Sequence, residues 1–170
     1  MKSKGIKIGS LLMALLLVSV LFVSFASANE ISQNDLEIKN AESLVTDKST
    51  ASGFVMFSDK SSTRSGVTYD LDVTITGVKS SGSYWYTLYG DSTATASENI
   101  DYIQASGTLM GPTLTANYGP AGRYNDDSTV ASGTLTDYYF WQTTYQNQGH
   151  GMYRINGVNY YLDSTASITT

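Results

Sequence analysis

Residues 67–76, VTYDLDVTIT, alternate strictly between apolar or aromatic side chains and polar ones. Successive side chains of a strand point to opposite faces, so this pattern predicts a strand with one buried face and one wet face. Six further segments have strand composition and are bounded by clusters of Gly, Pro, Asn, Asp or Ser. They are residues 53–58, 83–89, 102–110, 113–118, 129–136 and 138–145.

The most specific pairing signal lies near the end of the chain, where Asn-Gly at positions 156–157 separates the arms MYRI and VNYY. Asn-Gly is the preferred pair for a two-residue hairpin turn, because both positions need a positive φ. That turn pairs Ile155 with Val158 and Tyr153 with Tyr160. We therefore expect the domain to end in a tight Asn-Gly hairpin.

A five-residue string, ASGTL, occurs at residues 105–109 and again at residues 131–135. The offset of 26 residues corresponds to about two strands with their turns, which suggests the same Gly-containing bend or bulge at equivalent sheet positions. Almost no helical pattern follows residue 50. We therefore predict an all-β fold in one domain, residues 51–170: an antiparallel β-sandwich or closed barrel of about eight to nine strands.

The N-terminus has the features of a secretory signal peptide. Lysines precede an apolar run over residues 11–25, and Ala26-Ser27-Ala28 provides the small residues of a cleavage site. The run is shorter than the roughly 20 residues that a spanning helix needs, so no stable membrane anchor is expected. Residues 29–50 are polar and acidic, and we interpret them as a flexible leader, a stalk or a pro-segment.

Charge and cysteine content restrict the environment and the partners. With residues 1–28 removed, 142 residues carry seven basic and 15 acidic side chains, a net charge of −8. Nucleic acid is therefore an unexpected partner, because it binds clustered Lys and Arg. The chain has no cysteine and no N-x-S/T sequon. For a secreted chain this favours a prokaryotic exported protein, located outside the cell or at the cell surface.

Aromatic residues are dense in two of the predicted strands, 83–89 and 138–145, and they fall on both faces. A strand of a two-sheet sandwich buries one face, so one set of rings in each strand should be partly exposed. Exposed Tyr and Trp rings can stack on the C–H face of a sugar. Ordinary sheet packing is the alternative interpretation. The predicted ligand-binding residues are Trp85, Tyr86, Tyr139, Trp141 and Tyr145.

Catalytic and metal signals are weaker. His150, the chain's one histidine, lies in a glycine-flanked turn without a nucleophile motif, and the serines are too numerous to select one. The acidic candidates are Asp70 with Asp72 and the stretch 125–128. They could serve as acid and base or bind calcium only if folding brought a full set together. We therefore predict no catalytic residues, no metal site and no cofactor.

The sequence thus favours a secreted, non-catalytic binding protein that recognises a glycan or another cell-surface polymer through partly exposed Tyr and Trp on a sheet. A surface structural protein that associates with further copies of itself is the main alternative, because open strand edges low in Lys favour association. Two further alternatives remain: a small hydrolase that uses acidic residues such as Asp70 or Asp127, and a membrane-active toxin.

Overall fold

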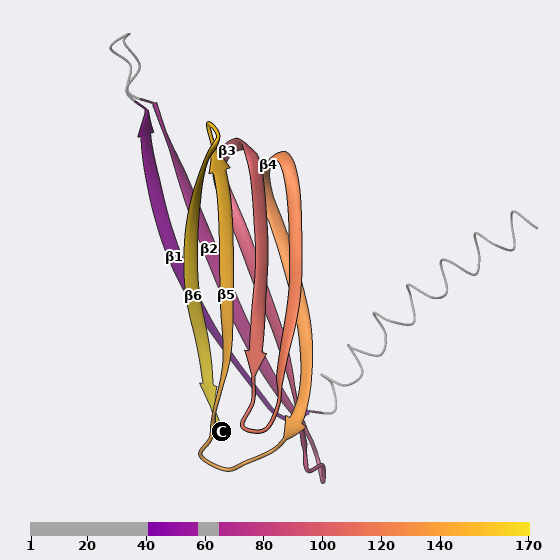
Figure 1. The fold of residues 1–170 in the computed structure, drawn as a ribbon. Helices are drawn as coiled ribbons and strands as arrows, with labels where there is room; N and C mark the ends of the chain where they lie inside the picture. The colour runs from indigo at the N-terminus through magenta and orange to yellow at the C-terminus, as the bar shows by residue number, and fades with distance from the viewer. Residues whose placement is uncertain (1–40, 58–64) are drawn as a thin grey trace, which may run out of the picture. The chain divides into compact units, whose positions relative to one another are not determined.

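The computed structural model describes residues 41–57 and 65–170, and six β-strands account for most of them (Figure 1). The strands are β1 (Ala41–Phe57), β2 (Ser65–Ser80), β3 (Trp85–Met110), β4 (Thr115–Tyr138), β5 (Thr144–Ile155) and β6 (Val158–Thr169). Every pairing is antiparallel, which confirms the predicted all-β class. The predicted signal peptide and residues 29–40 of the predicted leader lie outside the described residues.

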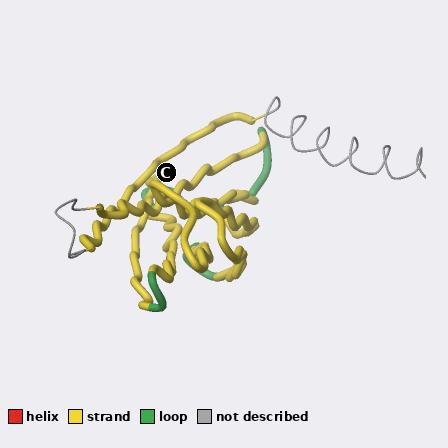
Figure 2. The backbone as a smooth tube through the Cα atoms, turned by 90° about the horizontal axis from the view of Figure 1, so that it is seen from above, coloured by secondary structure: helices red, strands yellow, loops and turns green. Residues whose placement is uncertain are grey.

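The sheet has the strand order β1-β2-β3-β5-β6, and β4 also pairs with β3. β3 and β4 both turn over near their middles, so each strand has two halves that face each other (Figure 1). Within β3, a Cβ atom on Gly90 would touch the Leu109 side chain, and within β4 a Cβ on Gly133 would touch Tyr118. The sheet therefore folds into two layers around one core (Figure 2).

Strand number differs from the sequence prediction, because six strands replace the expected eight to nine. Residues 85–89 and 102–110 of two predicted strands are parts of β3, and residues 115–118 and 129–136 of two others are parts of β4. The bend in β3 shifts the register between Thr95 and Ile100 without ending the strand. A bulge also lets β4 continue through Pro120, where a missing N–H is tolerated at a sheet edge.

β1 begins at Ala41, ten residues before the predicted domain boundary, so residues 41–50 belong to a strand rather than to a flexible leader. The polar composition of this segment did not indicate a strand. β1 is an edge strand whose ladder partner is β2 alone, and an edge strand can carry many polar side chains. Lys48 forms a 2.8 Å ion pair with Asp72 of β2, and Thr50 donates a 2.6 Å hydrogen bond to the same carboxylate. Polar cross-strand pairs thus hold the segment in register.

The C-terminal hairpin joins β5 to β6 around Asn156 and Gly157, both of which have positive φ. Ile155 pairs with Val158 and Tyr153 with Tyr160, as the turn type requires. The twelve residues of β6 continue to Thr169, well beyond the short arm that the sequence suggested.

Tyrosines fill much of the core, and they need both space and hydrogen-bond partners there. The buried Tyr118 hydroxyl lies 2.7 Å from the Ser92 hydroxyl and donates to the side-chain oxygen Oδ1 of Asn147 at 2.8 Å. The side-chain NH₂ group of Asn147 donates in turn to the backbone oxygen of Thr74 at 2.7 Å. These satisfied polar groups connect β2, β3, β4 and β5 across the core, as buried polar groups require.

Both copies of the ASGTL string border the same tyrosine ring. A Cβ atom on Gly107 would meet the hydroxyl end of Tyr118, and a Cβ on Gly133 would meet the base of that ring. Gly107 lies at a register shift of the ladder, whereas Gly133 pairs regularly with Gly90. The predicted bulge is therefore present in the first copy alone, and the glycines' common role is to leave room for Tyr118.

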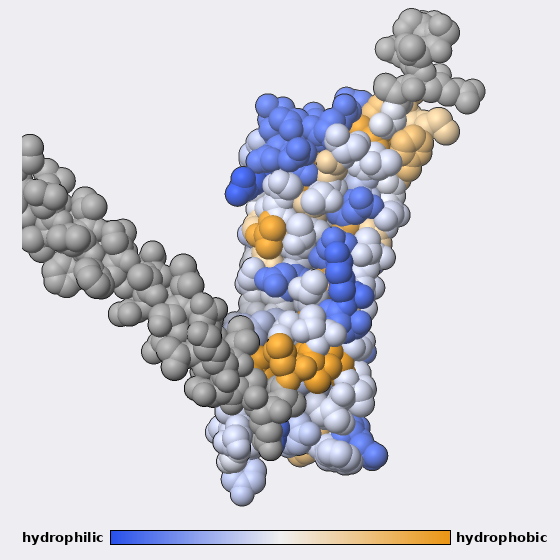
Figure 3. Space-filling model, turned by 180° about the vertical axis from the view of Figure 1, so that it is seen from behind, coloured by the Kyte–Doolittle hydropathy of each residue, from blue (hydrophilic) through white to orange (hydrophobic). Residues whose placement is uncertain are grey.

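The free edges of the two layers meet without forming a strand ladder. Ser164 of β6 donates a 2.8 Å hydrogen bond to Ser49 of β1, and the Ser167 backbone N–H donates to the Asp47 carboxylate at 2.9 Å. The sheet is therefore nearly closed and barrel-like. Seen from behind, its surface consists mainly of residues of intermediate or hydrophilic character, with hydrophobic residues in separate patches (Figure 3).

Candidate functional site

One end of the domain gathers aromatic side chains from the turn after β2, the start of β3 and the connection after β4. Backbone hydrogen bonds fix the connection 139–143. Tyr139 N–H donates to the Tyr84 oxygen at 2.9 Å, Gln142 N–H donates to the Thr170 oxygen at 2.7 Å, and Thr170 N–H donates to the Thr143 oxygen at 3.2 Å. We call this surface the aromatic end. It comprises Tyr84, Trp85, Tyr138, Tyr139, Phe140 and Trp141.

Trp85 and Tyr138 form the centre of the aromatic end. They are ladder partners on β3 and β4, and their rings stack with centroids 4.5 Å apart and planes inclined by 23°. Each of the two residues is 49% exposed. One broad aromatic surface therefore faces solvent, and the pairing of β3 with β4 fixes the position of both rings. Phe140 packs edge-on against Tyr138, with a centroid separation of 6.5 Å.

The aromatic end also holds a hollow of about 400 Å³ lined by Lys79, Gly82, Ser83, Tyr84 and Tyr139. The Lys79 ammonium lies 4.8 Å from the centroid of the Tyr139 ring, within the range of a cation–π contact. Tyr84 is 82% exposed and Trp141 74% exposed. Flat rings, hydroxyl groups and one cation therefore surround a shallow depression.

The structure separates the five predicted binding residues into two groups. Trp85 and Trp141 are exposed and Tyr139 is half-buried, whereas Tyr86 and Tyr145 are fully buried. The prediction that all five line one exposed surface is therefore wrong for Tyr86 and Tyr145. Tyr86 follows Trp85 directly in β3, so the two side chains point to opposite faces of the strand. For Tyr145 the cause is that residues 139–143 form a loop, so the alternation assumed for a strand over 138–145 does not apply.

The two buried tyrosines, Tyr86 and Tyr145, contact residues of the aromatic end from inside the core. Tyr86 packs edge-on against Tyr139 with ring centroids 5.7 Å apart. Burial, with the nearby Tyr145 and Tyr139 hydroxyls, raises the pKa of Tyr86 to about 12. The Tyr145 hydroxyl donates to the Tyr138 oxygen at 3.0 Å and accepts from the Phe140 N–H at 3.1 Å. Core tyrosines thus position the exposed loop that follows β4.

Sequence reasoning missed three members of the aromatic end, Tyr84, Tyr138 and Phe140. Tyr138 and Trp85 are 53 positions apart in the chain and become neighbours only through the pairing of β3 with β4. A signal was present in the sequence, since both segments carry adjacent aromatic residues. Which rings would meet depended on a register that the sequence did not reveal.

Asp137 fixes the turn between β3 and β4 at the same end. Its buried carboxylate accepts hydrogen bonds from the backbone N–H groups of Thr113 and Leu114, both at 3.0 Å, from the Thr113 hydroxyl and from the Tyr138 N–H. Burial by itself would raise the pKa of Asp137, but these hydrogen bonds outweigh it and the pKa is lowered. Asp137 is therefore a structural anion beside the aromatic end.

On the outer face of β5, His150 lies between Ser106 of β3 and Asp163 of β6, and the three are direct ladder partners. The imidazole Nδ1 is 2.6 Å from an Asp163 carboxylate oxygen. This is the residue order of a hydrolytic triad. However, no hydrogen bond joins Ser106 to His150 within the described residues, and Asp163 is 77% exposed to water. The row therefore lacks the buried aspartate and paired nucleophile of such enzymes.

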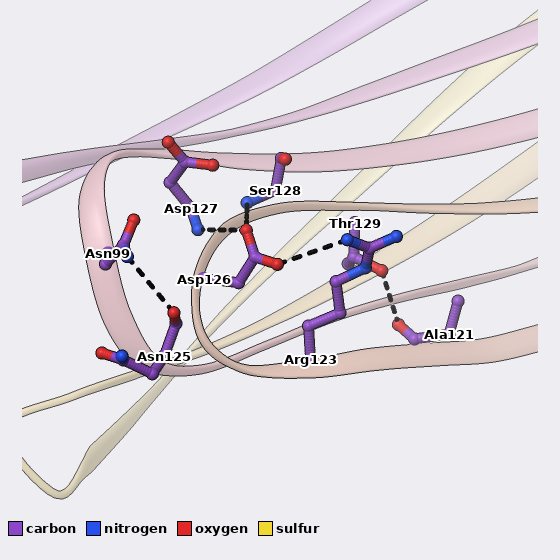
Figure 4. Close-up of polar contacts among 8 residues, drawn as sticks. All are labelled: Asn99, Ala121, Arg123, Asn125, Asp126, Asp127, Ser128 and Thr129. Carbon is purple, nitrogen blue, oxygen red and sulfur yellow. Dashed lines mark hydrogen bonds and ion pairs between the residues drawn. The ribbon is translucent and has the colours of Figure 1, made fainter.

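In the acidic stretch at the bend of β4, the Asp126 carboxylate binds groups of neighbouring residues (Figure 4). Asp126 accepts hydrogen bonds from the Asp127 N–H at 2.8 Å and the Ser128 N–H at 3.4 Å, and pairs with Arg123 at 3.3 Å. The two backbone donors and Arg123 lower the pKa of Asp126. In the ranges 41–57 and 65–170, no three His, Cys, Asp or Glu side chains cluster as metal ligands would.

No family model, curated protein or solved structure matches this chain. Across the described residues, no helix is long and apolar enough to cross a membrane.

Proposed function

We propose that this protein is a secreted, non-catalytic binding protein, and that its aromatic end recognises a glycan or another cell-surface polymer. The observation that carries the proposal is the stack of Trp85 on Tyr138, which presents a broad, rigid and half-exposed aromatic surface. Such a surface matches the apolar C–H face of a sugar ring. Phenol and indole groups at its rim can donate hydrogen bonds to hydroxyl groups.

Rigidity favours this use of the surface. The loop 139–143 is tied to the β2–β3 turn and to Thr170 by backbone hydrogen bonds, so the rings lose little further freedom when a ligand binds. A preorganised site loses less affinity to the ordering of side chains and loops. The adjacent hollow beside Tyr84 and Tyr139 would accept a substituent of the ligand.

Tryptophan fluorescence tests the proposal directly, because Trp85 and Trp141 are the chain's two tryptophans and both belong to the aromatic end. We expect red-shifted emission that acrylamide quenches and that one class of soluble polysaccharide protects. Trp141→Ala should weaken that polymer's binding two- to tenfold, since one aromatic contact contributes about 0.5–1.5 kcal/mol.

Tyr124→Ala is a matched control, because Tyr124 is also an exposed aromatic residue but lies at the bend of β4, at the other end of the strands. This variant should bind the polymer as the parent protein does. Emission that responds to no polymer in the panel, or equal losses in the two variants, would contradict a binding role for the aromatic end.

Self-association is a second candidate function, favoured by the outward face of β1. Leu44, Phe54 and Met56 are each more than half exposed on this edge strand. Exposed apolar groups on an edge strand favour pairing with another chain. Sedimentation velocity across a hundredfold concentration range tests this candidate: a constant sedimentation coefficient would contradict it, and a rising coefficient that Phe54→Lys abolishes would support it.

A further inference from the structure

A second hollow, of about 320 Å³, lies on the outer face of the sheet, away from the aromatic end. Three neighbouring strands line it, and their side chains share one face because the residues are ladder partners or alternate with them. Ser106 lines the hollow and is the ladder partner of His150. The lining residues of the hollow are Gln104, Ser106, His150, Gly151, Met152, Tyr161 and Asp163.

Hydrogen bonds already orient two polar groups of the hollow. Asp163 holds the His150 ring through Nδ1, so the Nε2 atom is the one left to face a ligand. Tyr102 donates a 2.9 Å hydrogen bond to the Gln104 side-chain oxygen, which leaves the amide NH₂ of Gln104 as a donor. The hollow therefore offers oriented donors and acceptors close together.

An apolar wall completes this arrangement. Met152 and Tyr161 are ladder partners, and the Tyr161 ring is 65% exposed. The volume is at the lower end of the roughly 300–1,000 Å³ of small-molecule sites, which suits one ring rather than a larger ligand. A carboxylate, an amide, an imidazole and a hydroxyl beside an aromatic face match the hydroxyl groups and C–H face of a sugar.

We infer that this hollow, which we call the His150 hollow, is a second subsite that binds one neutral sugar ring. The ligand class rests on the proposed function of the aromatic end, whereas the site itself rests on its own residues. Asp163 and Gln104 would bind neighbouring hydroxyl groups of the sugar, and Tyr161 would contact the ring face. Two separated subsites would let one polymer chain bind with a higher apparent affinity than either subsite alone.

His150 makes the test specific, because it is the chain's one histidine and its imidazole C–H signals are unique in an NMR spectrum. The protein is titrated with methyl glycosides of glucose, galactose, mannose and N-acetylglucosamine, while tryptophan emission is recorded in parallel. We expect a saturable shift of the imidazole signals with one of these sugars in the millimolar range. Asp163→Asn and Gln104→Ala should each weaken binding about tenfold, as the loss of a hydrogen-bonding group predicts.

Thr165→Ala is the matched control, since Thr165 is exposed on β6 two positions beyond Asp163 but does not line the hollow. This variant should keep the parent affinity. Imidazole signals that stay unchanged while the tryptophans respond to sugar would overturn the His150 hollow and leave the proposed function standing. An imidazole shift without a tryptophan response would support the hollow, and imidazole signals that respond to none of these sugars would overturn it. The titration with soluble polysaccharides decides the aromatic end separately.

Discussion

Trp85 and Tyr86 are adjacent in the chain, yet one is half exposed in the aromatic end and the other is fully buried in the core. They point to opposite faces of β3, as successive residues of a strand must. The same contrast separates Tyr138 from the buried Tyr145, whose hydroxyl accepts the backbone N–H of the loop between them. Aromatic density thus serves two purposes here: one set of rings builds the core, and the other covers its end.

Buried tyrosines also differ among themselves in how their hydroxyl groups are satisfied. The Tyr145 hydroxyl donates to the Tyr138 oxygen and the Tyr153 hydroxyl to the Asp70 oxygen, at 3.0 and 2.5 Å. The Tyr86 hydroxyl has no hydrogen-bond partner among the described residues. It lies against Gly77, where a Cβ atom would overlap it. The ring of Tyr86 therefore contributes its apolar area, while its hydroxyl opposes burial.

The largest expected effect comes from truncating the buried member of the adjacent pair. Tyr86→Ala should lower the free energy of unfolding by about 3–5 kcal/mol, because it leaves a ring-sized cavity in the core. Urea unfolding followed by far-UV circular dichroism measures this loss. Trp85→Ala is the matched control, and it should lower the free energy by less than about 1.5 kcal/mol. Equal losses would mean that the core does not depend on Tyr86 as its burial implies.

The connection between core and aromatic end can be broken at Asp137. Asp137→Ala should lower the free energy of unfolding by about 2–3 kcal/mol, because it removes a charged acceptor from the N–H groups of Thr113 and Leu114. Chemical denaturation at pH 7 measures the loss. Asp127→Ala, the same substitution at an exposed carboxylate, should change the free energy by less than about 0.5 kcal/mol. A similar small loss at Asp137 would contradict its role as an anchor.

Acidification sharpens the same comparison. The folded-state pKa of Asp137 is lowered, so its stabilisation is complete above the unfolded value, about 3.9, and is lost as pH falls through the lower folded value. The parent protein should therefore lose stability below about pH 4. Asp137→Ala should lose less over the same range, with the remainder due to Asp72 and Asp126, whose pKa values are also lowered. Parallel pH profiles for the two proteins would exclude a contribution from Asp137.

Removing the unpaired hydroxyl tests the difference among the buried tyrosines. Tyr86→Phe keeps the ring and should raise the free energy of unfolding by about 1 kcal/mol, because it removes the desolvation cost of that hydroxyl. Tyr145→Phe, which removes the hydrogen bonds to the Tyr138 oxygen and the Phe140 N–H, should lower the free energy of unfolding by a similar amount. Thermal unfolding by calorimetry compares the two variants, and changes of the same sign would contradict the distinction.

The smallest effect on stability is expected at the rim of the aromatic end. Trp141→Ala should change the free energy of unfolding by less than about 0.5 kcal/mol, because the side chain is largely exposed. The near-UV circular dichroism of the variant should otherwise retain the tertiary signals of the parent. A loss above about 2 kcal/mol would mean that Trp141 is a packing residue, and it would remove the ring from the proposed binding surface.

Local alternation made part of this fold predictable. In the segment 67–76, the five apolar or aromatic residues Val67, Tyr69, Leu71, Val73 and Ile75 are all buried in β2. The Asn-Gly turn similarly fixed its own neighbours, because a two-residue hairpin permits one register. Both signals depend on residues close in sequence, where backbone geometry alone decides which side chains face the same way.

The candidate sites were less predictable, because they depend on contacts between distant segments. Three of the five selected aromatic residues are exposed or half-buried, but their neighbours Tyr138 and Tyr84 were identified only once β3, β4 and the β2–β3 turn were placed together. The sequence has too many serines to indicate which one lies opposite His150. The ladder between β3 and β5 shows that it is Ser106.

The sequence by itself determined the all-β class, the buried face of β2 and the C-terminal turn, since each follows from the two-residue period of a strand or the φ preference of Asn-Gly. The tertiary structure decided that β3 and β4 double back into two layers, that Tyr86 is buried, and that Ser106, His150 and Asp163 form a row. Those outcomes depend on the pairing of strands far apart in the chain. A register shift of one residue would exchange the buried and exposed faces of a strand, so the pairing of distant strands decides which of these side chains meet.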